Sequence, residues 1–188
     1  AKSSGQWFNM NNNNSTIGGW ASCNMRNDTL PVVKTALPSD LQSVIKTTTL
    51  YTDNVGGTTS TTSDVTATQD DLYLLAEFEI FGARHYANGG EQNYQAQYSY
   101  YAAGNSKIKY RYDSTATASN AASWWERSIG VTTANYFCNI TGEGGPNRYA
   151  GRISFGFAPA FKVGGAKYTP VEYISSTGTQ YINTGYVP

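Results

Sequence analysis

The side chains best suited to nucleophilic or acid–base chemistry are few in this chain and stand far apart in the sequence. His85 is the single histidine, and it lies between Arg84 and Tyr86 in a polar stretch. Paired with Cys138 it would form a Cys–His dyad, in which the imidazole activates the thiol as a nucleophile. A lone histidine in a loop is more often simply solvated, so the sequence predicts a protein that is not an enzyme.

The carboxylates give equally little support to catalysis or to a metal site. Asp70 and Asp71 are neighbours, and neighbouring side chains of a strand point to opposite faces, which makes them a poor acid pair. Lectin-like folds often bind calcium through Asp, Asn and Glu oxygens, yet no acidic group here has a ligand spacing that predicts a site. We therefore predict no metal ligand and no cofactor, with calcium left as the open alternative.

The two cysteines are expected to be separate buried thiols. Cys138 alternates with residues expected to be buried, and Cys23 lies in an unrelated context. A small buried thiol behaves as an apolar side chain. The sequence therefore predicts Cα atoms farther apart than the roughly 7 Å that a disulfide allows.

Aromatic and amide side chains are what the chain has in surplus, and they hold sugars and protein surfaces through ring faces and hydrogen bonds. A predicted strand at 135–141 and the turn after it bring such residues together. The predicted ligand-binding face consists of Asn135, Phe137, Asn139, Glu143, Asn147, Arg148, Tyr149 and Arg152. An ordinary solvated hairpin, with Phe137 covered by a neighbouring loop, explains the pattern equally well.

The composition excludes one class of partner and favours another. Thirteen basic and thirteen acidic residues cancel, so no basic field attracts nucleic acid. Fifteen tyrosines and only 14% charged residues are typical of a β-rich extracellular or virion protein, and resemble a paratope. Strands favour Tyr and Thr in any case. No signal peptide and no apolar run near 18 residues is found, so membrane insertion is not predicted; because Ala1 is not methionine, we interpret the start as a fragment boundary.

The scaffold that must hold this face is organised around Trp124 to Ser128. Each Trp ring has roughly 150–250 Å² to bury, and in an extended segment the two rings point to opposite sides, one into the core and one onto a second surface. Arg127 is expected to pair with a carboxylate, a carbonyl or an aromatic face. The predicted structural core comprises Trp124, Trp125, Arg127 and Phe161, and truncating a buried Trp is expected to cost about 3–5 kcal/mol.

The other elements follow from periodicity and turn residues. The clearest helix is predicted at 38–46, with Ser39 as N-cap and an apolar face of Leu41, Val44 and Ile45. Residues 51–69 are poor in apolar side chains and predict a hairpin arm or a surface loop. The remaining predicted elements are a buried strand at 72–75, a helix at 77–81 ended by Gly82, a long loop at 83–106, and strands at 107–111, 135–141 and 153–163. The fold class predicted is α+β, a single domain with a twisted antiparallel sheet and two short helices.

Five motifs in this order resemble an uncharacterised domain family of gut bacteria and their phages. They are Gly18-Gly19-Trp20 with Met25-Arg26, Leu74 to Gly82, Lys107 to Tyr110, Trp124 to Ser128, and Phe155 to Phe161. The resemblance spans about residues 7–163. Two positions depart from the family pattern. Ala76 replaces a serine that would cap a helix, and Glu126 replaces a leucine, which predicts exposure or a polar contact.

The plan of that family in turn resembles the C-type-lectin fold, shared by formylglycine-generating enzymes and by hypervariable adhesins of diversity-generating retroelements. Residues 171–188 resemble the start of concanavalin/laminin-G-like lectin modules. The resemblance implies a domain at 1–163, a linker at 164–170 and the beginning of a second β-module at 171–188. In a retroelement-diversified adhesin, variation would act at Asn135, Asn139 and Asn147.

The resemblance implies a phage tail-fibre, receptor-binding or adhesin domain on a virion or cell surface. Its partners would be a host-surface glycan or protein and other virion or surface-protein subunits, for instance in a homotrimer. One alternative is a structural decoration or fibre-assembly domain of a virion. The other is a formylglycine-generating-type enzyme, which would need a reactive cysteine pair that Cys23 and Cys138 do not match.

Overall fold

The computed structural model describes residues 8–58, 60–110 and 120–164, and its helices and strands are short. The helical segments are α1 (Gly19–Ser22), the π-helix η1 (Met25–Thr29), α2 (Leu30–Thr35), α3 (Ser39–Val44), the 3₁₀ turn η2 (Thr62–Asp64), α4 (Glu77–Phe81), the 3₁₀ turn η3 (Gly89–Asn93) and α5 (Ser99–Ala102). The strands are β1 (Ile45–Lys46), β2 (Thr48–Asp53), β3 (Val65–Asp70), β4 (Lys109–Tyr110), β5 (Ala121–Ala122), β6 (Trp124–Ile129), β7 (Tyr136–Ile140), β8 (Pro146–Ala150), β9 (Gly156–Phe157) and β10 (Lys162–Val163). Mixed helices and small sheets confirm the α+β class. In these ranges no helix combines the length and apolarity that crossing a membrane requires.

The four-stranded sheet has the order β8-β7-β6-β9. β6 pairs antiparallel with β7, and the register shifts between Trp125 and Ile129, which marks a bulge. β8 pairs antiparallel with β7, whereas β9 runs parallel to β6. The prediction of a purely antiparallel sheet is therefore wrong at this edge, because the chain leaving β8 returns to the other side of the sheet before it adds its last strand.

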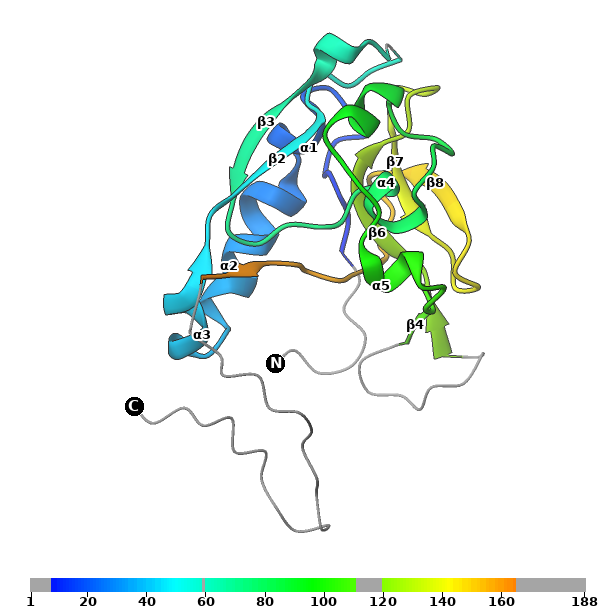
Figure 1. The fold of residues 1–188 in the computed structure, drawn as a ribbon. Helices are drawn as coiled ribbons and strands as arrows, with labels where there is room; N and C mark the ends of the chain where they lie inside the picture. The colour runs from blue at the N-terminus through cyan, green and yellow to red at the C-terminus, as the bar shows by residue number, and fades with distance from the viewer. Residues whose placement is uncertain (1–7, 59, 111–119, 165–188) are drawn as a thin grey trace.

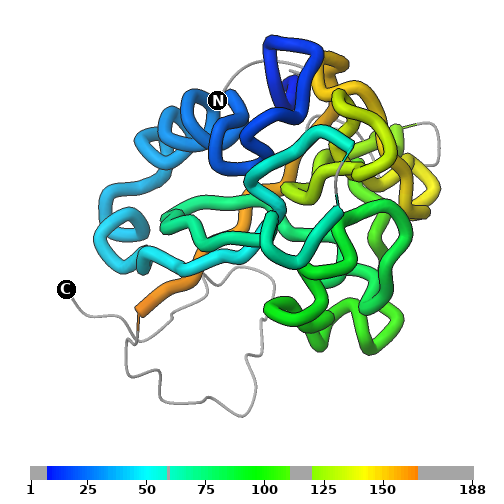
Figure 2. Tube along the Cα trace, turned by 90° about the horizontal axis from the view of Figure 1, so that it is seen from above, coloured from blue at the N-terminus to red at the C-terminus, as the bar shows by residue number. Residues whose placement is uncertain are grey.

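Two halves of the molecule meet along β6. Figure 1 shows the helices α1 and α2 with the β2–β3 hairpin on one side, and the four-stranded sheet with α4 and α5 on the other. The view from above in Figure 2 separates the same halves, blue and cyan from green and yellow. Short ladders join β1 to β10 and β4 to β5. The end of the described chain thus returns to an early segment at 45–46.

The β2–β3 hairpin confirms one of the two alternatives for residues 51–69. Its strands pair from Thr48↔Asp70 to Asp53↔Val65. The expectation that this polar stretch stays out of the core is wrong, because Thr52, Asp53 and Val65 are buried. Polar side chains are tolerated there because they are hydrogen-bonded: Asp53 Oδ1, for example, accepts from the backbone N–H groups of Val55 and Gly56.

The N-terminal helices α1, η1 and α2 were not predicted. They bury Trp20, Met25 and Leu30 in the main core. Their entry depends on Gly19, which has a φ of 51° and on which a Cβ would collide with the carbonyl of Asp53. Only glycine adopts this conformation at so close an approach.

The predicted helix at 38–46 exists in shortened form as α3. Pro38 and not Ser39 is the N-cap, no side chain caps the helix, and Ile45 already belongs to β1. Gln42 uses its side-chain amide to bind the Leu37 carbonyl at 2.6 Å. The predicted apolar face is wrong, since α3 buries no residue and Val44 is 38% exposed. The helix lies at the periphery, where no second layer covers it.

The predicted helix at 77–81 is confirmed as α4, and Gly82 ends it in the left-handed conformation with φ 68°. Ala76 has no side-chain oxygen to cap the first turn. Ser128 compensates in part, because its hydroxyl accepts from the Glu77 N–H at 3.1 Å. Glu79 accepts from the Ala76 N–H at 2.9 Å. The start of α4 is therefore tied to the strand β6.

Both tryptophans of β6 are buried, and they belong to different clusters. Trp125 lies in the main core with Trp20, Tyr73 and Phe137, among others. Trp124 packs with Ile80, Tyr101 and Ile140 in a second cluster. A third cluster holds Phe78, Ala87 and Cys138. The prediction that adjacent rings serve two surfaces is confirmed.

The predicted last strand at 153–163 is broken into pieces. It contains β9, an isolated bridge between Ala160 and Tyr73, and β10. The predicted strand at 72–75 likewise reduces to that bridge. Phe161, expected in the core, is 37% exposed. The segment pairs in turn with β6, with Tyr73 and with β1. Its side chains therefore do not share one buried face.

Candidate functional site

A cleft of about 330 Å³ opens between β2 and the segment that joins η3 to α5. Most lining side chains are polar or aromatic, and they come from distant parts of the chain. The lining residues are Thr49, Leu50, Tyr51, Glu79, Tyr94, Gln95, Ala96, Gln97, Tyr98, Ser99, Arg127 and Lys162. A cleft of this size holds a small ligand or one or two rings of a larger one.

One wall of the cleft is aromatic. The rings of Tyr51 and Tyr94 stack with centroids 4.3 Å apart and planes 9° apart, and Tyr94 is 51% exposed. Tyr98 is also exposed, at 37%. Exposed, mutually fixed rings offer a flat apolar face beside hydroxyl groups.

The segment that carries Tyr94 and Tyr98 is fastened by glutamines rather than by regular secondary structure. Gln95 donates from its amide to the Tyr51 carbonyl at 2.8 Å and to Glu91 at 3.0 Å. Gln97 donates to the Ile80 carbonyl at 3.0 Å. The Tyr98 N–H binds the Glu79 carbonyl at 2.9 Å. These bonds set the position of residues 94–99 against both halves of the molecule.

The floor of the cleft is a buried ion pair. Arg127 contacts both oxygens of Glu79, at 2.6 and 2.7 Å. It also donates to the Leu74 carbonyl at 2.8 Å and the Thr52 hydroxyl at 2.9 Å. Burial disfavours the charge, but the carboxylates of Glu79 and Glu91 outweigh this effect and raise the pKa of Arg127. The expectation that Arg127 pairs with a carboxylate is confirmed.

Glu91 lies beneath the wall at Gln95. Its carboxylate accepts from the Ser128 hydroxyl at 2.6 Å and from the Asp53 N–H at 3.1 Å. Burial raises the pKa of Glu91 to about 7 in spite of these bonds. The support of the cleft therefore contains a carboxyl group that titrates near neutral pH.

The predicted recognition face at 135–152 is not continuous. Phe137 and Asn139 are fully buried, because β7 is covered on both sides, and the prediction that they face solvent is wrong. The other members, at least partly accessible, are Asn135, Glu143, Asn147, Arg148, Tyr149 and Arg152. Asn135 binds Asn14 at 3.2 Å, and Arg148 lies over the Tyr86 ring and contacts Thr132.

The remaining candidates are placed in structural roles or apart from one another. Asp70 accepts from Arg26 at 2.6 Å, while Asp71 accepts from Lys34 at 2.6 Å, so the two carboxylates have separate partners. Hydrogen bonds from Lys34 and then Thr47 lower the pKa of Asp71. His85 is exposed and packs edge-on against Phe81, whereas Cys138 is fully buried.

Both cysteines are free and buried, as predicted. Burial raises the pKa of Cys23 to about 12, and its thiol donates to the Trp20 carbonyl at 3.3 Å. A thiol with so high a pKa is a poor nucleophile at neutral pH. The predicted linker and second module, apart from Gly164, lie outside the described residues.

The model of the family Domain of unknown function (DUF6273) matches residues 4–165. The chain belongs to this family. The prediction of an uncharacterised family over about residues 7–163 is confirmed at this level. No curated protein and no solved structure gives a significant match. The match includes every residue that lines the cleft, so in this chain the cleft lies within the DUF6273 domain.

The sequence did not predict this cleft. Its walls combine β2, residues 94–99 and Lys162, which are separated by up to about a hundred positions, and no local pattern joins them. The signal that was present is the density of Tyr, Gln and Asn in 83–106. Such a stretch cannot bury an apolar face of its own, and in the DUF6273 domain it is fixed by side-chain amides instead.

Proposed function

We propose that this DUF6273 domain is a non-enzymatic recognition module that binds a glycan of the host surface in the cleft beside Tyr94. The observation that carries the proposal is the stacked pair Tyr51–Tyr94 at the mouth of a polar cleft. Sugar rings present a C–H face to an aromatic ring and hydroxyl groups to amides. Gln97 and Ser99 line the same cleft and offer polar groups to such hydroxyls.

Rigidity of the floor supports the same function. Arg127 is held by four hydrogen bonds and is 1% exposed, so it fixes the shape of the cleft without reaching out of it. A preformed site loses less conformational entropy when it binds. A recognition module needs such a site, and a hydrolytic enzyme would need in addition a positioned acid, base or nucleophile.

The wider setting belongs to the same proposal. The order of the five motifs and the α+β class support a C-type-lectin-like plan, in which variable loops are carried on a fixed sheet. We place the domain in a phage fibre, a receptor-binding protein or a surface adhesin, beside other subunits of the particle or cell surface. A structural decoration domain is the competing function within this setting.

The test is binding of the purified chain to a glycan array and to the surface of candidate host cells, with melting measured in parallel. Tyr94→Ala should abolish binding or weaken it at least about fivefold, since a stacked ring in a hydrogen-bonded site contributes on the order of 1 kcal/mol or more. The melting temperature should hardly change because the ring is half exposed.

Tyr149→Ala is the matched control. Tyr149 is 48% exposed and belongs to the hairpin face predicted from the sequence, so its loss should leave glycan binding intact. Loss of binding in Tyr149→Ala but not in Tyr94→Ala would move the site to that hairpin. No glycan binding together with an oligomer mass that rises with protein concentration would favour the decoration domain.

A further inference from the structure

Glu126 is a buried acid without the partners that buried acids have. Its side chain is 0% exposed, and among the described residues neither carboxyl oxygen has a hydrogen-bond partner. An unpaired buried carboxylate costs several kcal/mol, so such a group is either protonated or bound to a cation. The expectation that Glu126 is exposed or in contact with a polar group is wrong as far as exposure is concerned.

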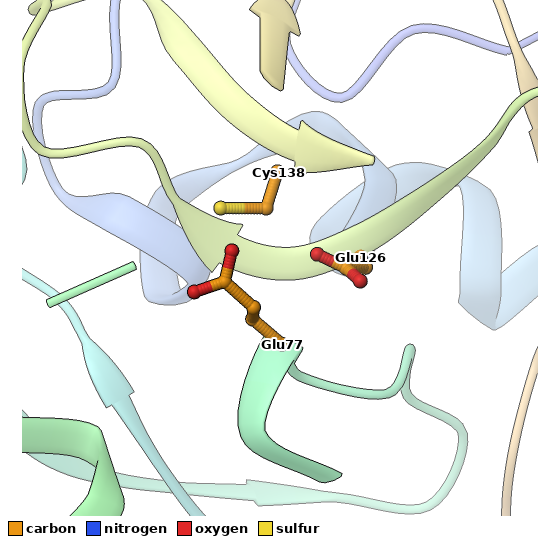
Figure 3. Close-up of side chains that lie close together, drawn as sticks. All are labelled: Glu77, Glu126 and Cys138. Carbon is orange, nitrogen blue, oxygen red and sulfur yellow. The ribbon is translucent and has the colours of Figure 1, made fainter. Parts of the chain in front are cut away.

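Two further side chains converge on Glu126. One oxygen of Glu77, one oxygen of Glu126 and the sulfur of Cys138 all lie within 4.8 Å of one another. Figure 3 shows Glu77 rising from α4 toward the sulfur of Cys138, with the carboxyl group of Glu126 beside them. All three residues are buried. A helix and two neighbouring strands thus bring three donor atoms to one point.

Glu77 is held in position by the loop that follows α4. Its Oε1 accepts from the backbone N–H groups of His85, Tyr86 and Ala87, at 2.8 to 3.0 Å, while Oε2 accepts from Tyr86 alone at 2.8 Å. Such bonds fix the orientation of the carboxylate, as outer-shell partners do for metal ligands. Oε2 retains room for a further interaction.

The donor set selects the kind of cation. A thiolate with carboxylate oxygens suits zinc and similar first-row ions, whereas calcium and magnesium take oxygen ligands only. Zinc bonds of about 2.0–2.3 Å place ligand atoms roughly 3.3–3.8 Å apart in a tetrahedron. Because the three donor atoms lie within 4.8 Å of one another, they would have to move together by about an ångström to reach this spacing.

We propose that Glu77, Glu126 and Cys138 form a buried site for one zinc ion, with a water molecule as fourth ligand. Zinc binds the thiolate form of Cys138, so the thiol proton is released to solvent when the ion binds. Burial, and next the charge of Glu77, raise the pKa of both Glu126 and Cys138 well above their usual values.

The experiment uses the purified chain after treatment with a chelator. Zinc added back should bind at one ion per chain by elemental analysis, and should raise the melting temperature by about 5–10 °C at a hundredfold excess over its Kd. Cobalt(II) in place of zinc should give the near-ultraviolet absorption of a cobalt–thiolate bond.

Variants assign the site. Glu126→Gln, which keeps the size and suits the uncharged state, should weaken zinc by more than the roughly 10–100-fold that loss of an outer-shell partner costs. Cys138→Ser should abolish the cobalt–thiolate absorption, whereas Cys23→Ser, at the other buried thiol, should keep it. Failure of the wild-type chain to bind zinc, or zinc binding unchanged in Cys138→Ser, would overturn the proposal. Glu126 would then be a carboxyl group that stays protonated.

Discussion

Glu126 and Arg127 are neighbours on β6 and both are buried, yet their surroundings are opposite. Arg127 has four hydrogen bonds, two of them to the carboxylate of Glu79. Glu126 has none among the described residues. The fold therefore accommodates these two buried ionisable side chains in different ways. One group is neutralised by the protein itself, and the other needs a proton or a metal ion.

The two residues also differ in what they support. Arg127 connects β2, the segment at Leu74 and α4 under the floor of the cleft, so its bonds serve the geometry of that site. Glu126 faces Glu77 and Cys138 beside the loop that carries His85 to Ala87. A change at Arg127 should therefore affect the fold and the cleft together, and a change at Glu126 should leave the cleft in place.

The largest loss of stability is expected when the ion pair between Arg127 and Glu79 is broken. Arg127→Met leaves the carboxylate of Glu79 buried without its partner and should cost about 3–5 kcal/mol of unfolding free energy. Denaturation by urea measures this cost. Adding Glu79→Gln should restore part of the stability, since no buried charge then remains unpaired. A cost below about 1 kcal/mol would mean that the ion pair contributes little.

Trp124 and Trp125, which precede these residues, test whether the clusters on the two sides of β6 contribute equally to the stability of the domain. Trp125→Ala should cost about 3–5 kcal/mol, and Trp124→Ala a value toward the lower end, because its cluster is smaller. Both variants are compared with the parent by thermal melting. If Trp124→Ala were the more damaging change, the second cluster and not the main core would be the stability centre of the domain.

Glu91 lies between these two cases, because it is a buried acid that accepts hydrogen bonds and still has a raised pKa. Its pKa is near 4.5 in the unfolded chain and about 7 in the fold, so the unfolded state loses its proton first. Stability should fall as pH rises from about 4.5 to about 7, by about 2–4 kcal/mol, and then stay level. Glu91→Gln should remove this part of the pH dependence. Equal slopes of the urea midpoint between pH 5 and 8 in both proteins would contradict it.

The smallest effect is expected at the start of α4, which positions both Glu77 and Glu79. Ala76→Ser supplies the missing capping oxygen and should raise stability by about 0.5–1 kcal/mol, a shift in melting temperature of about 1–4 °C. Ala103→Ser, at the C-terminal end of α5, should give no gain. A destabilised Ala76→Ser would mean that the buried site has no room for the hydroxyl group.

Local patterns predicted the parts of the fold that are decided locally. The double tryptophan marked β6, and Gly82 marked the end of α4, because ring burial and left-handed backbone depend on a few adjacent residues. The helices α1 to α2 escaped prediction since Gly18, Gly19 and Pro31 interrupt the apolar spacing there. Their helical state depends on packing against the main core.

The site depended on information that no local pattern contains. Asn139 and Phe137 were placed on a solvent face because alternation predicts one exposed side, but a strand covered on both sides gives the same pattern when it buries an amide. A glutamate within a strand predicts exposure, and Glu126 is the exception. Cleft residues from Thr49 to Lys162 meet only in the folded chain.

The pairing of early and late segments determines the order in which the domain can form. Phe8 bridges to Phe155, and β1 pairs with β10; the Trp125 indole also donates to the Phe8 carbonyl at 2.7 Å. These contacts span more than a hundred positions, and contacts of such long range make folding slow. On the ribosome the N-terminal segment must wait, with its sheet edge unpaired, until residues near 155–163 have emerged. At typical synthesis rates of about 5–20 residues per second that interval lasts roughly six to thirty seconds, during which the unfinished domain exposes surface that chaperones bind.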